Sequence, residues 1–303
     1  MSKKLIRSIL GVSLIVFLVW YFGFKKSDYT IQFKTKAATG TVYSGVLDWF
    51  ETYKKTDTLT YKVINNNLYN KLEVELKKDG KTFLYSYDIE KINDSISELT
   101  IDISEKGNGF YNKLTAPFFS TEFKTKQIQL IKNFKDGLTD HLSKLKVKLT
   151  GNKSSKPVFV AYINLNSIQE EKAQTMIMND HFITTYLREK KIKIIGTPYL
   201  EILNWDKESK KLNFNYCFPI EANANYIPDS KVKFKTIPVI KGLGATYYGN
   251  YRTSDRAWYS ILDYAQKNNI EIQDKVIEHF FANPFNGGNE LEWKTEIIIP
   301  TVN

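Results

Sequence analysis

The sequence has very little cysteine and histidine. Its 303 residues include one cysteine, Cys217, and three histidines, at positions 141, 181 and 279. A single cysteine can form neither an intrachain disulfide nor a cysteine-based metal cluster. The histidines are too far apart in the sequence to have the spacing of a zinc-binding motif. We therefore expect no metal site, and no other pattern in the sequence indicates a cofactor.

Signatures of common hydrolases and nucleotide-binding enzymes are also missing. The sequence contains no Gly-x-Ser-x-Gly nucleophile motif and no phosphate-binding loop. The stretch KGLGATYYG at residues 241–249 holds three glycines, but their spacing is not that of a phosphate loop. Motifs alone therefore leave open whether the protein is an enzyme.

Charge of one sign is concentrated in one part of the chain. The net charge is +10, yet residues 157–303 hold 17 basic and 17 acidic residues, so the excess lies in residues 1–156. The first 26 residues hold five basic residues and no acidic one. Nucleic-acid-binding domains usually carry a concentrated basic stripe or a known module, and neither is visible here. We therefore expect no nucleic-acid partner, and we interpret the basic flank as facing an anionic membrane surface.

The uncharged segment Ser8–Phe24 is predicted to anchor the protein in a membrane. Its 17 residues span about 25 Å as a helix, close to the thickness of a hydrocarbon core. Trp20 and Tyr21 stand near one end, where interfacial aromatic residues occur. A cleaved signal peptide is the alternative, but no small-x-small cleavage site follows. We expect residues 1–27 to be an uncleaved anchor, with the N-terminus cytoplasmic and both following domains outside the cytoplasm.

Residues 28–149 are predicted to form an α+β domain. Alternating apolar residues predict strands, Asp79-Gly80 predicts a hairpin turn, and apolar residues three or four apart predict a long helix from about Thr121 to Leu145. The strands are expected at residues 29–35, 59–64, 68–76, 82–92 and 96–103, with a shorter helix at about 41–55. This order resembles the helix-grip fold of the START-like (polyketide cyclase, SRPBCC) superfamily, in which a curved sheet wraps a long helix.

The helix-grip resemblance implies two roles for a cluster of aromatic residues. Such folds commonly enclose an apolar cavity, so Phe110, Tyr111, Phe118 and Phe119 either line a cavity or fill the core. If this domain carries the activity, the protein is a lipid-binding or scaffold protein.

The remainder of the chain is predicted to be a linker followed by an internally repeated domain. Residues 150–156 are polar, contain glycine and serine, and precede Pro157, which is typical of a linker. In residues 157–303, two successive stretches each read strand, helix, strand, strand. A duplicated α/β unit predicts a pseudo-twofold axis, and a groove between the halves is a natural ligand site.

Several short motifs in this second domain resemble the GyrI-like domain, which is also known as the effector-binding domain of AraC-type regulators. The matching stretches are IIGTPY at 194–199, YYGNY at 247–251, Trp258 with Leu262, EHFFANP at 278–284 and WKTEIIIP at 293–300. The resemblance implies a domain that binds small amphipathic molecules, often cations. AraC-type regulators also carry a helix-turn-helix domain, which this sequence lacks, so we do not infer transcriptional regulation.

A single carboxylate in the last strand is the main candidate for ligand recognition. Glu296 shares one strand face with Ile298, and a carboxylate in such a strand is costly unless it is paired. In GyrI-like domains the matching glutamate lies at the base of the pocket among aromatic residues. We therefore predict a ligand site formed by Glu296, Trp258, Tyr199, Tyr216 and Tyr248, with Glu296 attracting a cation and the rings stacking on it.

Two other roles for Glu296 are compatible with the sequence. Some GyrI-like proteins hydrolyse small electrophilic compounds, and Glu296 would then be the general base, with a pKa raised by apolar neighbours. Alternatively, Glu296 forms a structural ion pair, with Arg252 or Arg256 as the partner. The four predicted aromatic ligands could likewise belong to the core.

Overall fold

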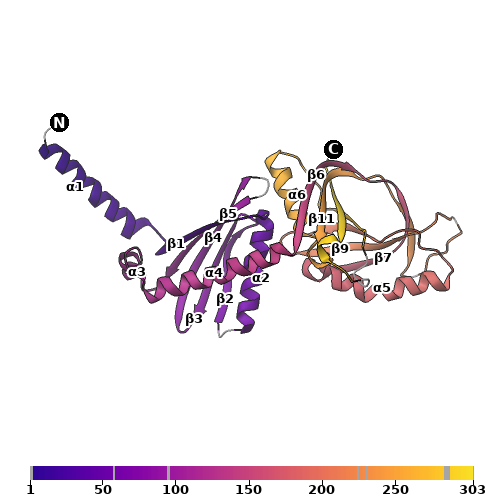
Figure 1. Cartoon of the computed structure of the whole chain (residues 1–303), viewed down its shortest axis with the longest axis horizontal. Helices are drawn as coiled ribbons and strands as arrows, with labels where there is room; N and C mark the ends of the chain where they lie inside the picture. The colour runs from indigo at the N-terminus through magenta and orange to yellow at the C-terminus, as the bar shows by residue number, and fades with distance from the viewer. Residues whose placement is uncertain are drawn as a thin grey trace. The chain divides into compact units, whose positions relative to one another are not determined.

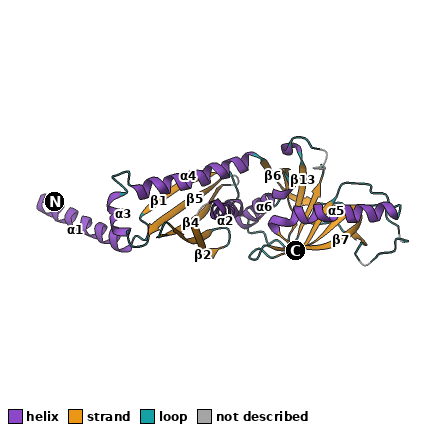
Figure 2. Ribbon diagram, turned by 90° about the horizontal axis from the view of Figure 1, so that it is seen from below, coloured by secondary structure: helices purple, strands orange, loops and turns teal. Residues whose placement is uncertain are grey.

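The protein folds into two compact α+β units, each built on an antiparallel sheet. The structure, a computed structural model, describes residues 3–56, 59–93, 96–223, 225–229, 231–282 and 287–302. One unit comprises residues 1–139 and the other residues 140–303. Figures 1 and 2 show a sheet with helices in each unit. This confirms the predicted α+β fold class.

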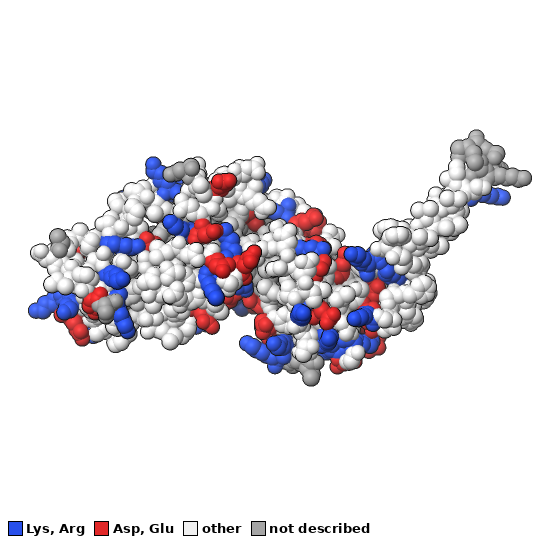
Figure 3. Space-filling view, turned by 180° about the vertical axis from the view of Figure 1, so that it is seen from behind, with Lys and Arg blue, Asp and Glu red and all other residues white. Residues whose placement is uncertain are grey.

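The apolar N-terminal segment forms one helix. Helix α1 (Lys3–Val19) continues into a π-helical turn, η1 (Trp20–Phe24). The window Ile6–Phe24 has a mean hydropathy of 1.9, and none of it is buried. Most of its surface carries no charged side chain (Figure 3). The segment is long and apolar enough to cross a membrane, a property that signal sequences near an N-terminus share.

The first sheet has the strand order β1-β5-β4-β3-β2, and every neighbouring pair is antiparallel. Its elements are β1 (Tyr29–Thr35), α2 (Thr39–Thr56), β2 (Leu59–Asn67), β3 (Lys71–Lys78), β4 (Lys81–Asn93), β5 (Ile96–Glu105), α3 (Gly109–Thr115) and α4 (Glu122–Ser143). The buried residues of α4 are Phe123, Gln127, Ile131, Phe134 and Leu138, which is the predicted face. The predicted hairpin turn is confirmed between β3 and β4, where Asp79 and Gly80 have φ values of 52° and 72°.

The aromatic cluster around α3 differs from both sequence-based alternatives. Phe110, Tyr111, Phe118 and Phe119 are 69%, 62%, 79% and 64% exposed, so they neither fill the core nor line a cavity. The buried residues of α3 are instead the polar Asn112 and Lys113. Hydrogen bonds explain this inversion, because three carboxylate and carbonyl acceptors hold the polar side inward. Asn112 Nδ2 donates to Glu105 Oε2 (3.1 Å) and Asp28 Oδ2 (3.5 Å), and Lys113 Nζ donates to the carbonyl oxygen of Lys25.

The second sheet has eight strands in the order β10-β7-β9-β8-β12-β13-β11-β6. The elements are β6 (Leu145–Ser154), β7 (Val158–Ile168), α5 (Lys172–Glu189), β8 (Tyr199–Trp205), β9 (Lys211–Pro219), β10 (Lys233–Ile237), β11 (Lys241–Gly249), η3 (Tyr251–Thr253), α6 (Arg256–Lys267), β12 (Val276–Phe280) and β13 (Lys294–Pro300). Two strand–helix–strand–strand series, β7-α5-β8-β9 and β11-α6-β12-β13, meet where β8 pairs with β12. The duplication and its pseudo-twofold axis remain predictions.

Most of the segment expected to be a linker is part of a strand. Residues 150–154 belong to β6, which pairs with β11 and takes the last position in the sheet. The side chains of β6 alternate between half-buried and exposed, so a polar composition is compatible with this edge position. Gly151 has a φ of 70° where the register with β11 shifts, which is the conformation a bulge requires. The glycine therefore reflects a bulge rather than a flexible linker.

Candidate ligand pocket

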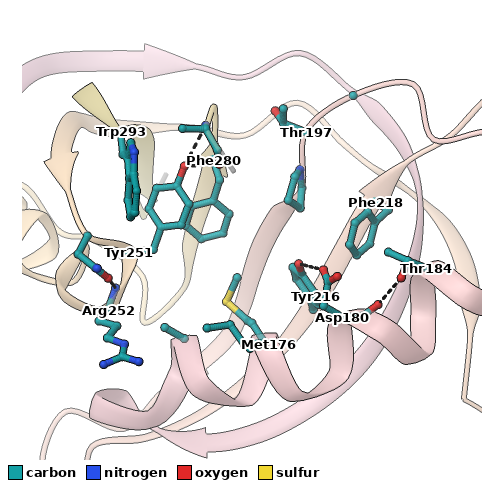
Figure 4. A pocket seen from close by; sticks show the side chains of 16 residues that line it. Met176, Asp180, Thr184, Thr197, Tyr216, Phe218, Tyr251, Arg252, Phe280 and Trp293 are labelled. Carbon is teal, nitrogen blue, oxygen red and sulfur yellow. Dashed lines mark hydrogen bonds between the residues drawn. The ribbon is translucent and has the colours of Figure 1, made fainter. Parts of the chain in front are cut away.

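A cavity of about 550 Å³ lies between helix α5 and the sheet of the second unit. Helix α5 contributes side chains at positions 173, 176, 177, 180 and 184, a spacing that places them on one helix face. Strand β9 contributes two aromatic residues, and the end of β12, the turn η3 and Trp293 form the remaining wall (Figure 4). The lining residues are Ala173, Met176, Ile177, Asp180, Thr184, Gly196, Thr197, Pro198, Tyr216, Phe218, Asn250, Tyr251, Arg252, Phe280, Ala282 and Trp293.

Three aromatic rings form one wall of this cavity. The ring centroid of Tyr251 lies 4.6 Å from that of Phe280 and 5.9 Å from that of Trp293, with tilted planes in both pairs. The Tyr251 hydroxyl donates to the carbonyl oxygen of Ala282 and accepts from its backbone N–H (2.9 Å). These bonds fix the orientation of the Tyr251 ring before any ligand arrives. Preorganised rings lose little conformational entropy when a ligand stacks against them.

A carboxylate stands away from this wall in the same cavity. The hydroxyl of Tyr216 donates to Asp180 Oδ1 over 2.7 Å, and Tyr216 packs edge-to-face on Phe218 at 5.0 Å (Figure 4). Burial raises the pKa of the Tyr216 hydroxyl, and the Asp180 charge raises it further, so the phenol stays protonated. Arg252 is the other charged residue of the lining, and Figure 4 shows it far from Asp180 within the cavity. The cavity therefore combines an aromatic wall with two separated charges.

Of the residues predicted to bind a ligand, Tyr216 lines this cavity. Trp258 is fully buried in the core, where its indole Nε1 donates to Glu278 Oε1 over 2.7 Å. Glu296, Tyr199 and Tyr248 are not among the lining residues. Their strand neighbours explain this placement, because side chains on one strand alternate between the two faces of a sheet. Phe280 lines the cavity and pairs with Thr295 of β13, so the next residue, Glu296, takes the other face.

Glu296 forms ion pairs with two lysines. Lys153 Nζ and Lys294 Nζ each lie 2.6 Å from one of its carboxylate oxygens. Burial raises the pKa of Glu296, but the hydrogen bonds from the two lysines outweigh burial and leave the pKa below its ordinary value. The expected arginine partners are replaced by lysines, and Arg256 instead pairs with Asp255 at 3.0 Å. The cost of a carboxylate in this strand is thus offset by two ammonium groups.

Glu296 shares its sheet face with a compact aromatic group. The ring of His279, its partner in the β12–β13 register, lies between Tyr199 and Phe281 with centroid distances of 3.9 and 4.1 Å. His279 Nε2 is 2.9 Å from the hydroxyl of Thr197, which also lines the cavity on the other side. Tyr199 and Glu296 therefore lie on one face of the sheet, while Tyr216 lines the cavity on the other face.

The protonation of His279 is expected to make the second unit sensitive to mild acid. Burial lowers the pKa of His279 to about 4, while the nearby Glu296 charge opposes this shift. A folded pKa below the unfolded value of 6.5 means that the contribution is present above pH 6.5 and is lost as the pH falls towards 4. After allowance for solvent screening we expect a loss of about 1–2 kcal/mol.

This acid sensitivity is measured by urea unfolding of the protein and of His279→Gln at several pH values between 4 and 7. The slope of stability against pH should be smaller in the variant, and NMR should show the His279 ring titrating near pH 4. A ring that titrates near 6.5 would contradict the argument.

Asp180, Tyr251, Phe280 and Trp293 line the cavity but were not predicted to do so from the sequence. The available signal was weak: Asp180 continues the helical spacing of Ala173 and Met176, and a carboxylate on such a face is unusual. Nothing local indicates that this helix face and the strand ends of the second half meet.

A comparison with known protein families gives one match within the second unit. Residues 160–302 match the family model described as the GyrI-like small molecule binding domain. No curated protein matches the chain.

Several solved structures are similar to this chain. The EcmrR C-terminal domain matches at 16% identity and a TM-score of 0.43, covering 52% of this chain and 98% of that domain. SAV2435, solved bound to tetraphenylphosphonium, matches at 11% identity and a TM-score of 0.37, covering 52% of this chain and 94% of that one. A hydrolase from Listeria innocua matches at 8% identity and a TM-score of 0.35, covering 56% and 98%.

Proposed function

We propose that residues 160–302, which match the GyrI-like small molecule binding domain, bind an amphipathic molecule with a cationic group in the cavity beside α5. The observation that carries this proposal is the combination of the aromatic wall with Asp180. The Asp180 carboxylate accepts a hydrogen bond from the neutral Tyr216 hydroxyl, and among the described residues it forms no ion pair. A carboxylate that is not neutralised by an ion pair can bind the cationic group of a ligand.

The size and lining of the cavity support such a ligand. Its volume of about 550 Å³ falls within the range of about 300–1,000 Å³ that is usual for small-molecule sites. A cationic group on the face of a Tyr or Trp ring gains about 0.5–2 kcal/mol. The net gain from the Asp180 charge is smaller than its Coulomb attraction, because both ions lose water on binding. We therefore assign affinity mainly to the rings and discrimination between charges to Asp180.

Removal of the Asp180 charge should weaken binding of a cation more than binding of a neutral analogue. We expect Asp180→Asn to cost tetraphenylphosphonium about 1–3 kcal/mol, the scale of a lost charged interaction. The neutral triphenylphosphine oxide should lose much less, because it never used the charge. The measurement is a calorimetric titration of the full chain in nanodiscs, with empty nanodiscs as the blank. Equal losses for both probes would exclude Asp180 as the group that selects charge.

Glu296 is the alternative charge-selecting group, and the same titration tests it. To bind a cation, Glu296 would first have to release Lys153 or Lys294, which lie 2.6 Å away. Glu296→Gln is therefore expected to leave the ranking of the two probes unchanged. If the preference for the cation disappears in Glu296→Gln and persists in Asp180→Asn, the ligand binds on the opposite sheet face with Tyr199.

The hydrolase alternative is not favoured by the electrostatics around Glu296. A general base acts best when its pKa lies near the working pH, which for a glutamate requires a raised pKa. The two lysines hold the pKa of Glu296 below its ordinary value. Glu296 is thus a weak base in this arrangement, and ligand binding is the better proposal.

The N-terminal half contains the apolar helix and the first sheet. We propose that Ser8–Phe24 spans a membrane, with a cytoplasmic N-terminus and both units outside the cytoplasm. The apolar window Ile6–Phe24, with its uncharged run Ser8–Phe24 and basic flanks, supports this arrangement. The strand order of the first sheet and the burial of α4 support a helix-grip fold. We propose no nucleic-acid partner, because the basic residues form no recognisable binding module.

A further inference from the structure

An inverted helix stands next to the end of the apolar N-terminal helix. Helix α3 buries its polar side and exposes its apolar side, the reverse of a helix on a soluble domain. We use the name α3 surface for five exposed residues: Phe110 (69%), Tyr111 (62%), Leu114 (49%), Phe118 (79%) and Phe119 (64%). Five large apolar side chains within ten residues form a patch that requires an explanation, whereas scattered single ones would not.

Direct contacts tie the α3 surface to the last turn of the N-terminal helix. The Tyr21 hydroxyl donates to the carbonyl oxygen of Lys113 over 3.0 Å, and the rings of Phe22 and Phe110 lie 5.0 Å apart. The buried ammonium group of Lys113 donates to the carbonyl oxygen of Lys25. Figure 1 shows α3 beside the point where the N-terminal helix ends. The α3 surface is therefore held at the level of residues 21–25.

That level is the boundary of the proposed membrane span. The apolar window ends at Phe24 and is followed by Lys25 and Lys26. Aromatic residues concentrate at this depth in membrane proteins, because their rings favour the layer between hydrocarbon and water. The α3 surface is bonded to this same turn. If the helix spans the bilayer, the α3 surface therefore lies at the membrane interface.

The charge around the patch fits a lipid surface. No acidic residue occurs between Lys106 and Thr121, nor before Asp28, so both segments next to the patch are neutral or basic. Asp28 and Glu105 are buried and accept hydrogen bonds from Asn112. Glu122, three residues after Phe119, is exposed but pairs with Lys126 at 2.8 Å. Anionic headgroups attract such a surface and repel an acidic one.

From these contacts we propose that the α3 surface inserts into the interfacial layer of the bilayer and forms a second, monotopic attachment beside the helix. This inference rests on the proposed membrane span. An apolar face of this kind penetrates only about 5–10 Å, to the boundary between headgroups and acyl chains. With two attachments, the first unit is held against the membrane and cannot swing freely about the residues that follow Phe24.

The depth of Phe118 in a bilayer tests the proposal. The full-length Phe118→Cys variant is labelled with the environment-sensitive fluorophore NBD and placed in vesicles of phosphatidylcholine and phosphatidylglycerol. Phe118 is 79% exposed, so the substitution removes no core packing, and Cys217 is fully buried. Unsubstituted protein carried through the same labelling gives the background. The matched control is Ile64→Cys on β2, 49% exposed at the opposite edge of the sheet from β1.

We expect nitroxide lipids labelled near the headgroup to quench the Phe118 label at least threefold more than the Ile64 label, and aqueous iodide to show the reverse order. Equal quenching of the two labels by both reagents would overturn the inference while leaving the anchor intact. Self-quenching that depends on the number of labelled copies, without quenching by lipid, would overturn it in favour of self-association. Release of the protein by a carbonate wash would refute the membrane span itself, and with it this inference.

Discussion

Replacement of Lys172 by methionine is expected to lower the free energy of unfolding of the second unit by about 3–5 kcal/mol, the usual cost of removing one partner from a buried ion pair. Lys172 and Glu278 have side chains that are 1% and 0% exposed, and Lys172 Nζ lies 3.9 Å from Glu278 Oε2. Methionine preserves the length of the side chain but leaves the Glu278 carboxylate without its counter-charge. The variant therefore tests charge rather than volume.

Lys172 also satisfies two oxygen atoms near the pocket. Its ammonium group donates to the carbonyl oxygen of Tyr251 (3.0 Å) and to the hydroxyl of Ser254 (2.7 Å). The same group lies 5.6 Å from the centre of the Trp258 ring. These contacts hold the start of α6 and the pocket residue Tyr251 to the start of α5. The loss of stability should therefore be accompanied by looser ligand binding.

The cost of the Lys172 substitution should depend on pH. Burial raises the pKa of Glu278 above its ordinary value of 4.5, and the Lys172 charge opposes that shift. A raised folded pKa makes the contribution of Glu278 to stability complete below pH 4.5 and lost as the pH rises through the folded pKa. Without Lys172 the folded pKa rises further, so Lys172→Met should be less destabilised at pH 5 than at pH 8.

Two variants separate this effect from a general loss of structure. The double variant Lys172→Met/Glu278→Gln removes both charges and should recover part of the stability. Lys210→Met removes a partner from the more exposed pair with Glu170 and should cost about 0–1 kcal/mol. Hydrogen exchange in α6 peptides during urea unfolding reports on this unit alone. If Lys172→Met and Lys210→Met are equally stable, the buried pair contributes little.

Substitution of Gly242 by alanine is expected to destabilise the second unit by about 3 kcal/mol, at the upper end of the usual cost of overpacking. A Cβ atom at this position would lie 2.1 Å from the carbonyl oxygen of Ile299 and 2.7 Å from the Cα atom of Pro300. Both obstacles are backbone atoms of β13, which pairs with β11 at Gly242 and Pro300. A backbone in a sheet can move only by disturbing its own hydrogen bonds.

The control for Gly242 is a glycine with space around it. Gly137 lies in α4 with no atom within 4 Å of its would-be Cβ, so Gly137→Ala should stabilise that helix by about 0.5–1 kcal/mol. Urea unfolding of both variants gives the comparison. A Gly242→Ala protein as stable as the parent would mean that β11 and β13 separate without cost. The close approach of β11 to β13 would then not explain why glycine occurs in KGLGATYYG.

The sequence predicts local structure well where one physical signal dominates. The spacing of Phe123, Ile131 and Phe134 identified the buried face of α4, and Asp79-Gly80 identified a hairpin. The motif WKTEIIIP carried the resemblance that the family match confirms. Each of these signals lies within one short segment, of which the longest is the 12 residues from Phe123 to Phe134, and in each the local preference agrees with the final fold.

Features that depend on distant partners were not predictable in the same way. The apolar character of Phe118 suggested that it is buried. The sequence does not show that Asn112 and Lys113 form the buried side of α3. The polar composition of residues 150–154 is compatible with both a linker and an edge strand. The two lysines that cover Glu296 come from β6 and from its own strand, and only the sheet brings Lys153 there. The pocket was also not predictable from the sequence, because residues of α5 and Trp293 come together only in the folded unit.

The pairing of β8 with β12 at the centre of the second sheet has a consequence for how this unit is made. Strands β7, β9 and β8 are close in sequence and can pair as soon as they leave the ribosome. The free edge of β8, however, must wait for β12, which begins 71 residues after β8 ends. At about 5–20 residues per second, that edge stays unpaired for roughly 4–14 s. An exposed strand edge invites pairing with other chains. The nascent second unit should therefore be most prone to aggregation, and most dependent on chaperones, in the interval before residues 276–280 appear.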